Sequence, residues 1–487
     1  MLNRLRSLRV KRPPLVIAAC LALFAGVGLA RYQLLPEARW IVAALLAFLY
    51  YARRQSLVTL ACVVVLFFSL GWWRGTQMAV AVAPYREFSK KNVTLTARAA
   101  EDGVYGEKSQ MVFTVDHVRL LDPRPVSLPG NMAIAGFGVP AVYRGDEVQI
   151  SGKLYPRRGN VQAGISFAQM QVLSRGNSPI DTLRRKFAAG MQSALPEPLA
   201  SFGMGLLIGQ RSTLPKEIAD ILVTVGLTHI IAVSGYNLTI IVEAARRLFG
   251  SRSKYQMLVV CLTLISTFLL LTGSSPSIVR ASIISMLSIL SWYYGRKIKP
   301  MVLLLTAAAI TVAANPLYLW GNVSWYLSFL AFFGVVVIAP LVVGRVYGER
   351  EPKLVAKMLL ESLCAEIMTL PYALYIFGQL SLVSLPANVL IAAFVPLAML
   401  LCTVAGLAGM WLPVVAGWFA WPARLVLRYM LDAADLLSRT PHALVEHIGF
   451  SFGQLLFWYG IVALWLGMGH YKRRLKHGIL TDKIAQK

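Results

Sequence analysis

Long stretches without a charged residue are the dominant pattern along this chain. No Asp, Glu, Lys, Arg or His occurs in the 57 residues from Ile367 to Ala423, the 45 from Pro300 to Gly344, or the 25 from Tyr255 to Val279. A helix needs about 20 predominantly apolar residues to cross the roughly 30 Å of hydrocarbon in a bilayer. Because no soluble core needs such stretches, the pattern predicts a polytopic α-helical membrane protein.

The apolar segments predict about twelve membrane-spanning helices, three before a polar insert and nine after it. Several are shorter than about 20 residues, which favours tilted, broken or re-entrant helices. An even number of spans places both ends of the chain on one side of the membrane. The predicted spans are Leu15–Ala30, Trp40–Tyr51, Leu57–Trp73, Gly226–Glu243, Met257–Leu271, Ala281–Tyr294, Met301–Asn315, Ser324–Val343, Leu354–Phe377, Ala387–Gly406, Leu407–Trp421 and Phe452–Met468.

Between Pro84 and Arg175 the pattern changes to short alternating segments such as "NVTLTARA" and "DEVQISGKL", separated by Gly, Pro and Asp. A period of two residues predicts half-buried β-strands. About five or six strands suit a small β-barrel, with an OB-like fold as the leading candidate. Arg144, Gly145 and Asp146 are most simply a turn before a strand. With 12 basic and 8 acidic side chains, the domain favours neither nucleic-acid binding nor a purely scaffolding role.

The basic residues, which give a net charge of +26, lie where the positive-inside rule for membrane proteins places them. Basic clusters precede the first span and follow the last one. This distribution predicts cytoplasmic N- and C-termini and a β-rich insert on the outer face. Since membrane topology explains much of the charge, charge alone is weak evidence for a nucleic-acid ligand.

Composition supports this organisation: 57% of the residues are apolar and 14% are charged, against about 25% charged in soluble domains. The five cysteines lie in apolar stretches without disulfide or zinc-ligand spacing. We expect five regions: N-terminal transmembrane helices at 1–80, the β-rich domain at 84–178, amphipathic interfacial helices at 180–225, the main transmembrane domain at 226–470, and a basic cytoplasmic tail at 471–487.

The segment "GLTHIIAVSGYNL" places four polar or helix-breaking residues inside an otherwise apolar span: His229, Ser234, Gly235 and Asn237. Gly235 can kink or break the helix, and the Ser and Asn side chains can satisfy the freed backbone groups. Polar groups at membrane depth usually face a cavity or a partner helix. The segment is therefore a candidate functional site.

Four strings in order along the chain resemble the ComEC family, the inner-membrane DNA channel of natural competence. They are "GLTHIIAVSGYNL", "SSPSIVRA", "NPLYLW" followed by "WYLSFLAFFG", and "FGQLSLVSLPANVL". The N-terminal spans and the β-rich insert are also similar to those of the family. The candidate DNA path drawn from these strings consists of His229, Ser234, Gly235, Asn237, Pro276, Arg280, Ser328 and Asn388.

Two features depart from the family pattern. Many members end in a metallo-β-lactamase-like nuclease domain, whereas this chain stops soon after its last span and its six histidines form no His-x-His-x-Asp-His cluster. We therefore expect a short form without that domain, a transporter rather than an enzyme. Tyr236 and Asn237 also stand where the family usually has a Leu-His pair, which leaves the role of these positions open.

The resemblance implies a channel in the bacterial cytoplasmic membrane that passes single-stranded DNA inward during natural transformation. Its implied partners are the lipid bilayer, an outer-face DNA receptor, a nuclease supplied by another chain, and a cytoplasmic ATPase or single-strand-binding proteins. No cofactor is expected. The chain lacks a G-x-x-x-x-G-K-[ST] loop, so ATP-driven pulling would come from another protein.

Arg280 is the candidate cation of the path. It follows the uncharged run that ends at Val279, at the point where a polar loop meets a new span. A polyanion can cross hydrocarbon only through a polar, cation-bearing conduit, and an arginine at such a depth often marks an ion pathway. The alternative is that Arg280 extends to lipid headgroups while its helix packs through small residues.

Secondary candidates are less specific. Arg424 and Arg428 share a helical face with Asp432 and Asp435, which is typical of a solvated surface with internal ion pairs. Glu361 and Glu366 lie five residues apart in one span, so they do not share a face. They could serve proton coupling or pair with basic groups. His229 has no second ligand at helical spacing, and we expect no metal site there.

Two further functions compete with the DNA channel. An intramembrane serine hydrolase would use Ser234 with His229, but residues five apart point in different directions around a helix. A polytopic exporter of a small solute or a lipid-linked sugar fits the composition equally well. It differs from the channel in predicting normal DNA uptake by a strain that lacks the gene.

Overall fold

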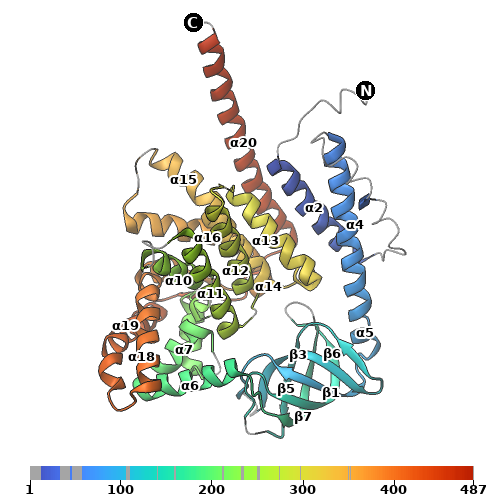
Figure 1. The fold of residues 1–487 in the computed structure, drawn as a ribbon, viewed down its shortest axis with the longest axis vertical. Coiled ribbons are helices and arrows are strands. Elements are labelled where there is room, and N and C mark those ends of the chain that lie inside the picture. The colour runs from blue at the N-terminus through green and yellow to red at the C-terminus, as the bar shows by residue number, and fades with distance from the viewer. Residues whose placement is uncertain are drawn as a thin grey trace.

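A computed structural model of the 487-residue chain gives the architecture. Described are residues 12–485, except 33–43, 46–56, 106–109, 140, 158–160, 211–212, 232–234, 249–252, 274, 297, 349 and 351. Helices form most of this part of the chain, and one β-rich domain follows the N-terminal helices in the sequence and lies at one end of the molecule (Figure 1).

Among the described residues, six helical segments are long and apolar enough to cross a membrane. They are Pro13–Ala30, Leu57–Glu87, Lys254–Thr272, Val323–Val346, Val355–Phe377 and Ser384–Trp411. Three shorter apolar helices are Leu199–Ile208, Pro300–Ala314 and Phe452–Met468. The prediction of a polytopic helical membrane protein is confirmed. The number twelve stays a prediction, and the predicted span Trp40–Tyr51 lies almost wholly outside the described residues.

The N-terminal helices and the helices after residue 226 have the following bounds. They are α2 (Arg12–Ala30), α4 (Leu57–Val82), α9 (Thr228–Ile231), α10 (Gly235–Leu248), α11 (Lys254–Thr272), α12 (Pro276–Tyr293), α13 (Pro300–Ala314), α14 (Val323–Phe333), a π-helical turn (Gly334–Ile338), α15 (Ala339–Val346), α16 (Leu354–Phe377), α17 (Ser384–Leu390), α18 (Val395–Trp411), α19 (Ala416–Ser438) and α20 (Phe452–Ala485). Short 3-10 turns occur at Pro316–Tyr318 and Ala392–Phe394.

Several predicted spans are interrupted. The predicted helix Leu407–Trp421 is wrong: α18 ends at Trp411 and α19 begins at Ala416. Pro413 explains the break, because it lacks a backbone N–H and pushes the preceding residue out of helical geometry, and Leu412 has φ −133° and ψ 56°. Within the predicted span Gly226–Glu243, the helices α9 and α10 are described, and residues 232–234 between them lie outside the described part of the chain.

Seven strands form one sheet in the described part of residues 84–178, which follows the short helix α5 (Pro84–Glu87). They are β1 (Asn92–Ala99), β2 (Val104–Tyr105), β3 (Met111–Asp122), β4 (Val126–Leu128), β5 (Met132–Phe137), β6 (Glu147–Pro156) and β7 (Ala163–Ser174). Buried and open positions alternate along β1, as its sequence predicts. The pairings β1–β6, β6–β7, β7–β5, β5–β3 and β3–β1 return to the first strand, and β5–β7 is parallel.

The segment between the sheet and the main helical part differs from the predicted set of amphipathic surface helices. It contains α6 (Pro179–Ala194), α7 (Leu199–Ile208) and α8 (Lys216–Thr224). α6 and α8 have one apolar and one polar face, whereas all ten residues of α7 are buried. α7 is therefore part of the main core cluster, together with residues of α18 and α19.

Close contact between α6 and α18 depends on glycine. A Cβ atom on Gly190 would lie 2.7 Å from both the carbonyl oxygen of Gly406 and the backbone nitrogen of Met410. These are backbone atoms of α18, which cannot rotate away. The helices pack at this distance only because Gly190 has no side chain.

Gly190→Ala is therefore expected to destabilise the fold by about 1–3 kcal/mol, the usual cost of overpacking. The measurement is the fraction of detergent-solubilised protein that stays monodisperse after heating. Gly417→Ala in α19 is the matched control, since a Cβ there meets nothing within 4 Å. Equal heat resistance of the two variants would contradict the packing described.

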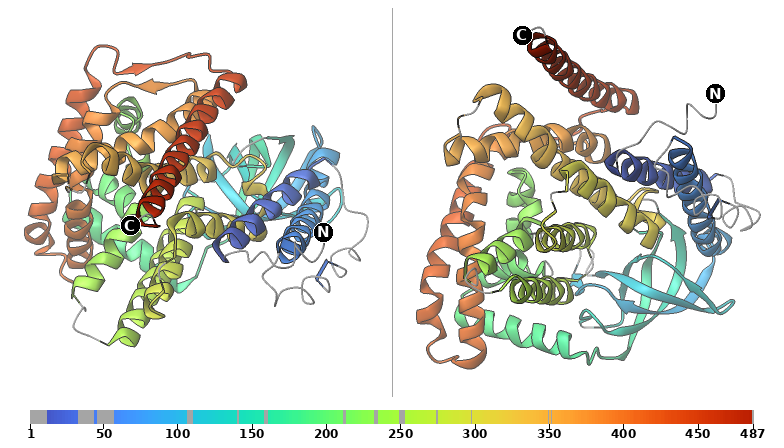
Figure 2. Two further views of the ribbon diagram at one scale, coloured as in Figure 1. Left: turned by 90° about the horizontal axis from the view of Figure 1, so that it is seen from above. Right: turned by 45° about the horizontal axis from the view of Figure 1, so that its top comes forward.

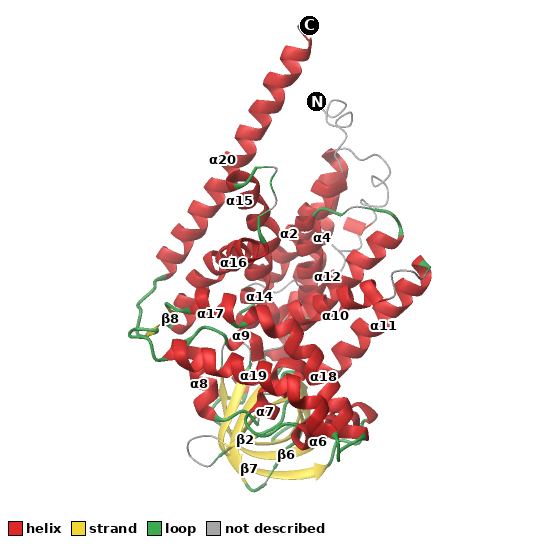
Figure 3. Ribbon diagram, turned by 90° about the vertical axis from the view of Figure 1, so that its left-hand side faces the viewer, coloured by secondary structure: helices red, strands yellow, loops and turns green. Residues whose placement is uncertain are grey.

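The β-domain lies at one end of the molecule. Figure 3 shows the strands gathered at that end and the C-terminal part of α20 projecting at the other. Two further views place α18 and α19 at one side of the helical part, and the β-domain with α2 and α4 at the other (Figure 2). This arrangement brings the sheet close to the loop between α11 and α12, where the candidate site is found.

Candidate functional site

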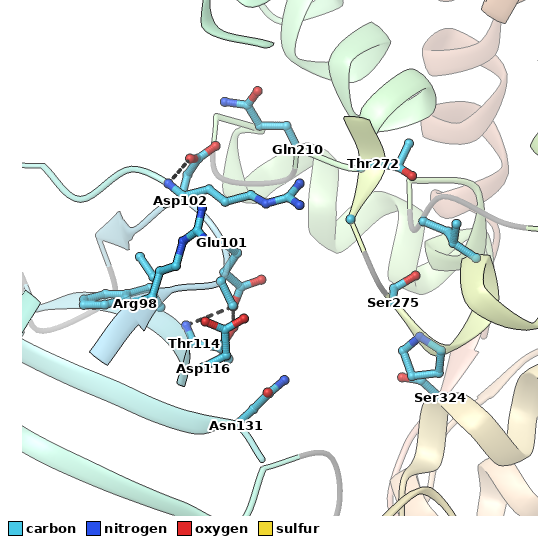
Figure 4. Close-up of a pocket in the computed structure, with 18 of the residues that line it drawn as sticks. Arg98, Glu101, Asp102, Thr114, Asp116, Asn131, Gln210, Thr272, Ser275 and Ser324 are labelled. Atoms are coloured by element: carbon cyan, nitrogen blue, oxygen red, sulfur yellow. Dashed lines mark hydrogen bonds between the residues drawn. The ribbon is translucent and has the colours of Figure 1, made fainter. Parts of the chain in front are cut away.

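A cavity of about 970 Å³ lies between the β-domain and the helical domain. Figure 4 shows Arg98, Glu101 and Asn131 on the β-domain side, facing Thr272 at the end of α11 and Ser275 just before α12. The lining also includes the first residues of α12 and residues just before α14. We call this space the interdomain cavity. Its walls combine charged and polar side chains with apolar ones, whereas the spans beyond it are mainly apolar.

Charged side chains from two elements pair across the interdomain cavity. Arg98 of β1 lies 3.5 Å from the carboxylate of Asp181 on α6, and Arg184 of α6 lies 3.9 Å from Asp102 after β1. The two ion pairs are reciprocal, because each element supplies one cation and one anion. They fix α6 against the β-domain at the wall of the cavity.

Arg184 is a cation with unused hydrogen-bonding capacity. Its residue is 9% exposed, and its Nε and Nη1 atoms are buried without a hydrogen-bond partner among the described residues. Burial lowers the pKa of Arg184, and the nearby Asp102 carboxylate opposes that shift. A guanidinium has five N–H donors, so this side chain can still bind an anion such as a phosphate.

The predicted turn at residues 144–146 is confirmed, and it also contributes to the cavity. Gly145 has φ +91°, and the buried Asp146 accepts hydrogen bonds from the backbone N–H groups of Tyr143 (3.0 Å) and Gly176 (3.0 Å). The Arg144 side chain donates to the carbonyl oxygen of Leu271 at the end of α11, 3.4 Å away. The turn therefore connects the β-domain to the α11–α12 loop.

Arg280 lies two residues beyond Ile278, the last residue of α12 that lines the cavity. α12 begins with Pro276 at its first position, where the missing N–H costs nothing. Pro276 and Ser277 line the cavity, and the Oγ atoms of Ser277 and Ser328 are 2.9 Å apart. Nη1 of Arg280 donates to the backbone carbonyl of Ser328, 2.7 Å away. Hydrogen bonds from Ser277 and Arg280 thus join α12 to α14.

The surroundings of Arg280 are closed. The residue is 7% exposed, its guanidinium carbon lies 5.0 Å and 5.8 Å from the ring centroids of Phe332 and Phe329, and its Nε has no partner among the described residues. A Cβ atom on Gly235 would lie 2.8 Å from its Nη2. Arg280 therefore does not line an open passage in this conformation, which differs from the arrangement predicted for a conduit. Ser234 lies outside the described residues.

Asn237 has a structural contact in α10. It is 2% exposed, and its Nδ2 donates to the carbonyl oxygen of Leu206 in α7 over 3.0 Å. A buried amide with a backbone partner positions one helix against another. In this conformation Asn237 therefore fixes α10 to α7.

His229 and Asn388 belong to a second polar cluster. The Nδ1 of His229 donates to the carbonyl oxygen of Gly226, 3.2 Å away, and the Asn388 side chain is its other hydrogen-bonding neighbour. In the same region the Ser384 hydroxyl donates to the Glu366 carboxylate. The sequence candidates are thus divided between two places: Gly235, Arg280, Ser328 and Pro276 in one, and His229, Asn388 and Glu366 in the other.

The secondary arginines lie on α19. Arg428 is paired with Asp432 over 3.7 Å, and both side chains are mostly exposed, as the interpretation of a solvated face predicts. Arg424 and Arg428 line a second cavity of about 460 Å³ against the start of α7 and α8. Glu361 is half-buried on α16. In the described part of the chain, no three His, Cys, Asp or Glu residues are grouped as a metal site would require.

The cavity residues Arg98, Asp102, Asp181 and Arg184 were not among the sequence candidates. They come from a strand and a helix about eighty positions apart, and no spacing rule connects them. The only sequence signal was the basic run that contains Arg184, Arg185 and Lys186, which fits an interfacial helix equally well.

The fold and site define a class: a polytopic membrane protein whose β-domain and helices enclose a polar cavity above a buried arginine. The chain belongs to the competence protein family, because the model of that family matches residues 206–473, more than half of its length. This match includes α12, α14, α16 and α17, and it confirms the resemblance predicted from the sequence.

One curated relative is ComE operon protein 3 of Bacillus subtilis (strain 168). It is 24% identical over 313 residues, which cover 62% of this chain and 38% of the relative. The aligned region therefore spans well under half of that protein. No solved structure matches the chain significantly.

Proposed function

We propose that this protein is a channel that passes single-stranded DNA into the bacterial cytoplasm during natural transformation. The observation that carries the proposal is the position of Arg280, a buried cation directly beyond the lining of a polar cavity, within the region matched by the competence family. A DNA strand that crosses the membrane along this path meets a polar entrance first and then a cation inside the membrane.

The interdomain cavity has the chemistry of an entrance for a polyanion. A single strand carries about one negative charge per nucleotide, and proteins answer it with basic side chains along the backbone. Arg98, Arg144 and Arg184 line the cavity, and carboxylates pair with two of them in this conformation. Phosphates can replace these carboxylates as partners, and the two unused donors of Arg184 offer a first contact.

The contacts between α12 and α14 then act as a closed gate. Ser277, Arg280 and Ser328 join the two helices where the cavity ends, and Gly235 allows α10 to approach the guanidinium. Passage of a strand requires α12 and α14 to separate. On separation, Arg280 exchanges the Ser328 carbonyl for a phosphate oxygen.

The remaining predictions are part of the same proposal. The strands β1, β6, β7, β5 and β3 pair in a closed order, with β5 and β7 parallel, and this order is that of an OB-like barrel. OB folds often bind single-stranded nucleic acid. The β-domain lies on the outer face, the basic tail lies in the cytoplasm, and the membrane is the bacterial cytoplasmic one. An outer-face DNA receptor, a nuclease and a cytoplasmic ATPase or single-strand-binding protein are the proposed partners.

Arg184→Gln is expected to reduce DNA entry about tenfold or more, because a hydrogen bond to a charged group contributes about 1.5–3 kcal/mol. The measurement is the amount of labelled DNA that becomes resistant to external nuclease. Arg185→Gln is the matched control: this neighbour on α6 is exposed and donates to the carbonyl oxygen of Gly176. Normal DNA entry in the Arg184→Gln variant would show that the interdomain cavity is not part of the DNA path.

Deletion of the gene tests the function itself. Labelled DNA is followed in two fractions, one bound to the surface and one protected inside the cell. The channel predicts normal surface binding and loss of the protected fraction, with recovery when the gene is restored. An exporter of a solute or a lipid-linked sugar predicts normal protection, and that result would refute the proposal.

A further inference from the structure

Glu366 has a carboxylate at membrane depth that is hydrogen-bonded through only one of its two oxygens among the described residues. It lies on α16, within the candidate span Val355–Phe377. One carboxylate oxygen, Oε1, accepts a hydrogen bond from the Ser384 hydroxyl at the start of α17. The other, Oε2, is buried and has no hydrogen-bond partner among the described residues.

Two further elements lie beside Ser384, the hydrogen-bond partner of Glu366. The Ser381 hydroxyl, in β8 (Leu380–Ser381), is also buried without a partner in the described part of the chain. Gly226 lies against both serines: a Cβ there would be 2.8 Å from Cβ of Ser384 and 3.4 Å from Oγ of Ser381. Gly226 has φ +72°, a backbone conformation that favours glycine. The β8–α17 segment and the turn before α9 therefore meet next to Ser384.

Polar groups of α9 and α17 lie beside this cluster. The carbonyl oxygen of Gly226 accepts a hydrogen bond from His229. Asn388 of α17 is the second hydrogen-bonding neighbour of His229. Gly226 and its partner His229 therefore lie next to Ser384 and Ser381.

No cation is recorded in an ion pair with Glu366 among the described residues. The titratable groups on the elements packed around it include His229 on α9, Tyr326 on α14, Arg345 on α15 and Tyr459 on α20. On α16 itself they are Lys357, Glu361, Cys364, Tyr372 and Tyr375. The hydroxyls of Tyr326 and Tyr459 donate to the backbone carbonyls of Leu319 and Met368. A buried carboxylate without a compensating cation is costly in its charged form.

We propose that Glu366 is a proton-binding site whose loading and release accompany transport. A proton binds Oε2, which converts the carboxylate to a neutral carboxyl group and removes the uncompensated charge. Deprotonation reverses the step, and no oxidant or other reactant is required.

The first test measures proton binding without DNA. Purified full-length protein in lipid nanodiscs is treated with a hydrophobic carbodiimide, which reacts with protonated carboxyl groups, and labelled peptides are located by mass spectrometry. We expect labelling at Glu366 that falls as pH rises and is absent in Glu366→Gln. Glu243→Gln, which removes an exposed partner of Arg247, is the matched control and keeps the label.

Three outcomes of the labelling would overturn the proposal. Glu366 could stay unlabelled at all pH values, its labelling could be independent of pH, or sodium ions could protect it at constant pH. The last result would assign the site to a metal cation instead of a proton.

The second test concerns coupling, and it rests on the proposed DNA channel. DNA entry is measured with an imposed pH gradient and after its collapse. Glu366→Gln is expected to lose the difference between the two conditions, Glu366→Asp to keep it in part, and Glu243→Gln to keep it fully. An unchanged gradient effect in Glu366→Gln refutes coupling. If DNA is not the substrate, entry is the same in every strain, including one that lacks the gene, while the labelling result stands, so the two failures are distinguishable.

Discussion

Replacement of Arg280 by Gln is expected to reduce DNA entry by about 100-fold, because the side chain supplies a charge-assisted contact of up to about 3 kcal/mol. Glutamine keeps a hydrogen-bond donor for the carbonyl oxygen of Ser328 but loses the charge that a phosphate requires. The structure of the closed protein can therefore survive while transport is lost. The measurement is transformation frequency together with the protected fraction of labelled DNA.

Two controls separate the loss of charge from misfolding. Arg280→Lys keeps the cation but not the planar group that lies over the Phe332 and Phe329 rings, and we expect partial activity. Arg428→Gln makes the same replacement at an exposed site with an Asp432 partner, and it should transport normally. If Arg280→Gln reaches the membrane in normal amounts and transforms as well as Arg428→Gln, Arg280 is not part of the path.

The membrane architecture could be predicted from local sequence because a bilayer imposes a simple requirement. Runs without charge, such as Pro300–Gly344, can satisfy it only as helices, and α13, α14 and part of α15 lie in that run. The turn around Gly145 was predicted for a similar reason, since few residues accept its positive φ. In these cases one local property decides the structure.

Helix breaks were harder to place. Gly235 was identified as a position where a helix can break, and this stays a prediction because residues 232–234 lie outside the described part of the chain. The break after Trp411 was missed because the segment around it is uniformly apolar. Hydropathy alone does not register the missing N–H of Pro413, although the residue itself was visible in the sequence.

The candidate site needed three-dimensional information. Arg280 was identified from its position at the end of an uncharged run, but its burial depends on Phe329, Phe332 and Gly235, which belong to other helices. The interdomain cavity depends on how α6 docks against β1, and Arg98 and Asp181 carry no signal of that contact in the sequence. Long-range packing determined which polar residues meet.

A reversible cross-link between α12 and α14 is expected to have the largest effect on transport. The hydroxyl oxygens of Ser277 and Ser328 are 2.9 Å apart, so cysteines at both positions lie close enough for a disulfide. Ser277 lines the interdomain cavity, where an oxidant in water can reach it. The chain's own cysteines at 20, 261, 364 and 402 are buried, and Cys62 is half-buried. The variants with only Ser277→Cys or only Ser328→Cys would reveal a disulfide between an introduced cysteine and a native one.

The most direct measurement is therefore DNA entry in the variant Ser277→Cys with Ser328→Cys, before and after reduction. We expect DNA entry to stop when the disulfide is formed and to return when it is reduced. In the variants with only Ser277→Cys or only Ser328→Cys, we expect DNA entry to continue under both conditions. Undiminished entry with the disulfide formed in nearly every molecule would contradict the proposal, because the strand would then cross the membrane without separating α12 from α14.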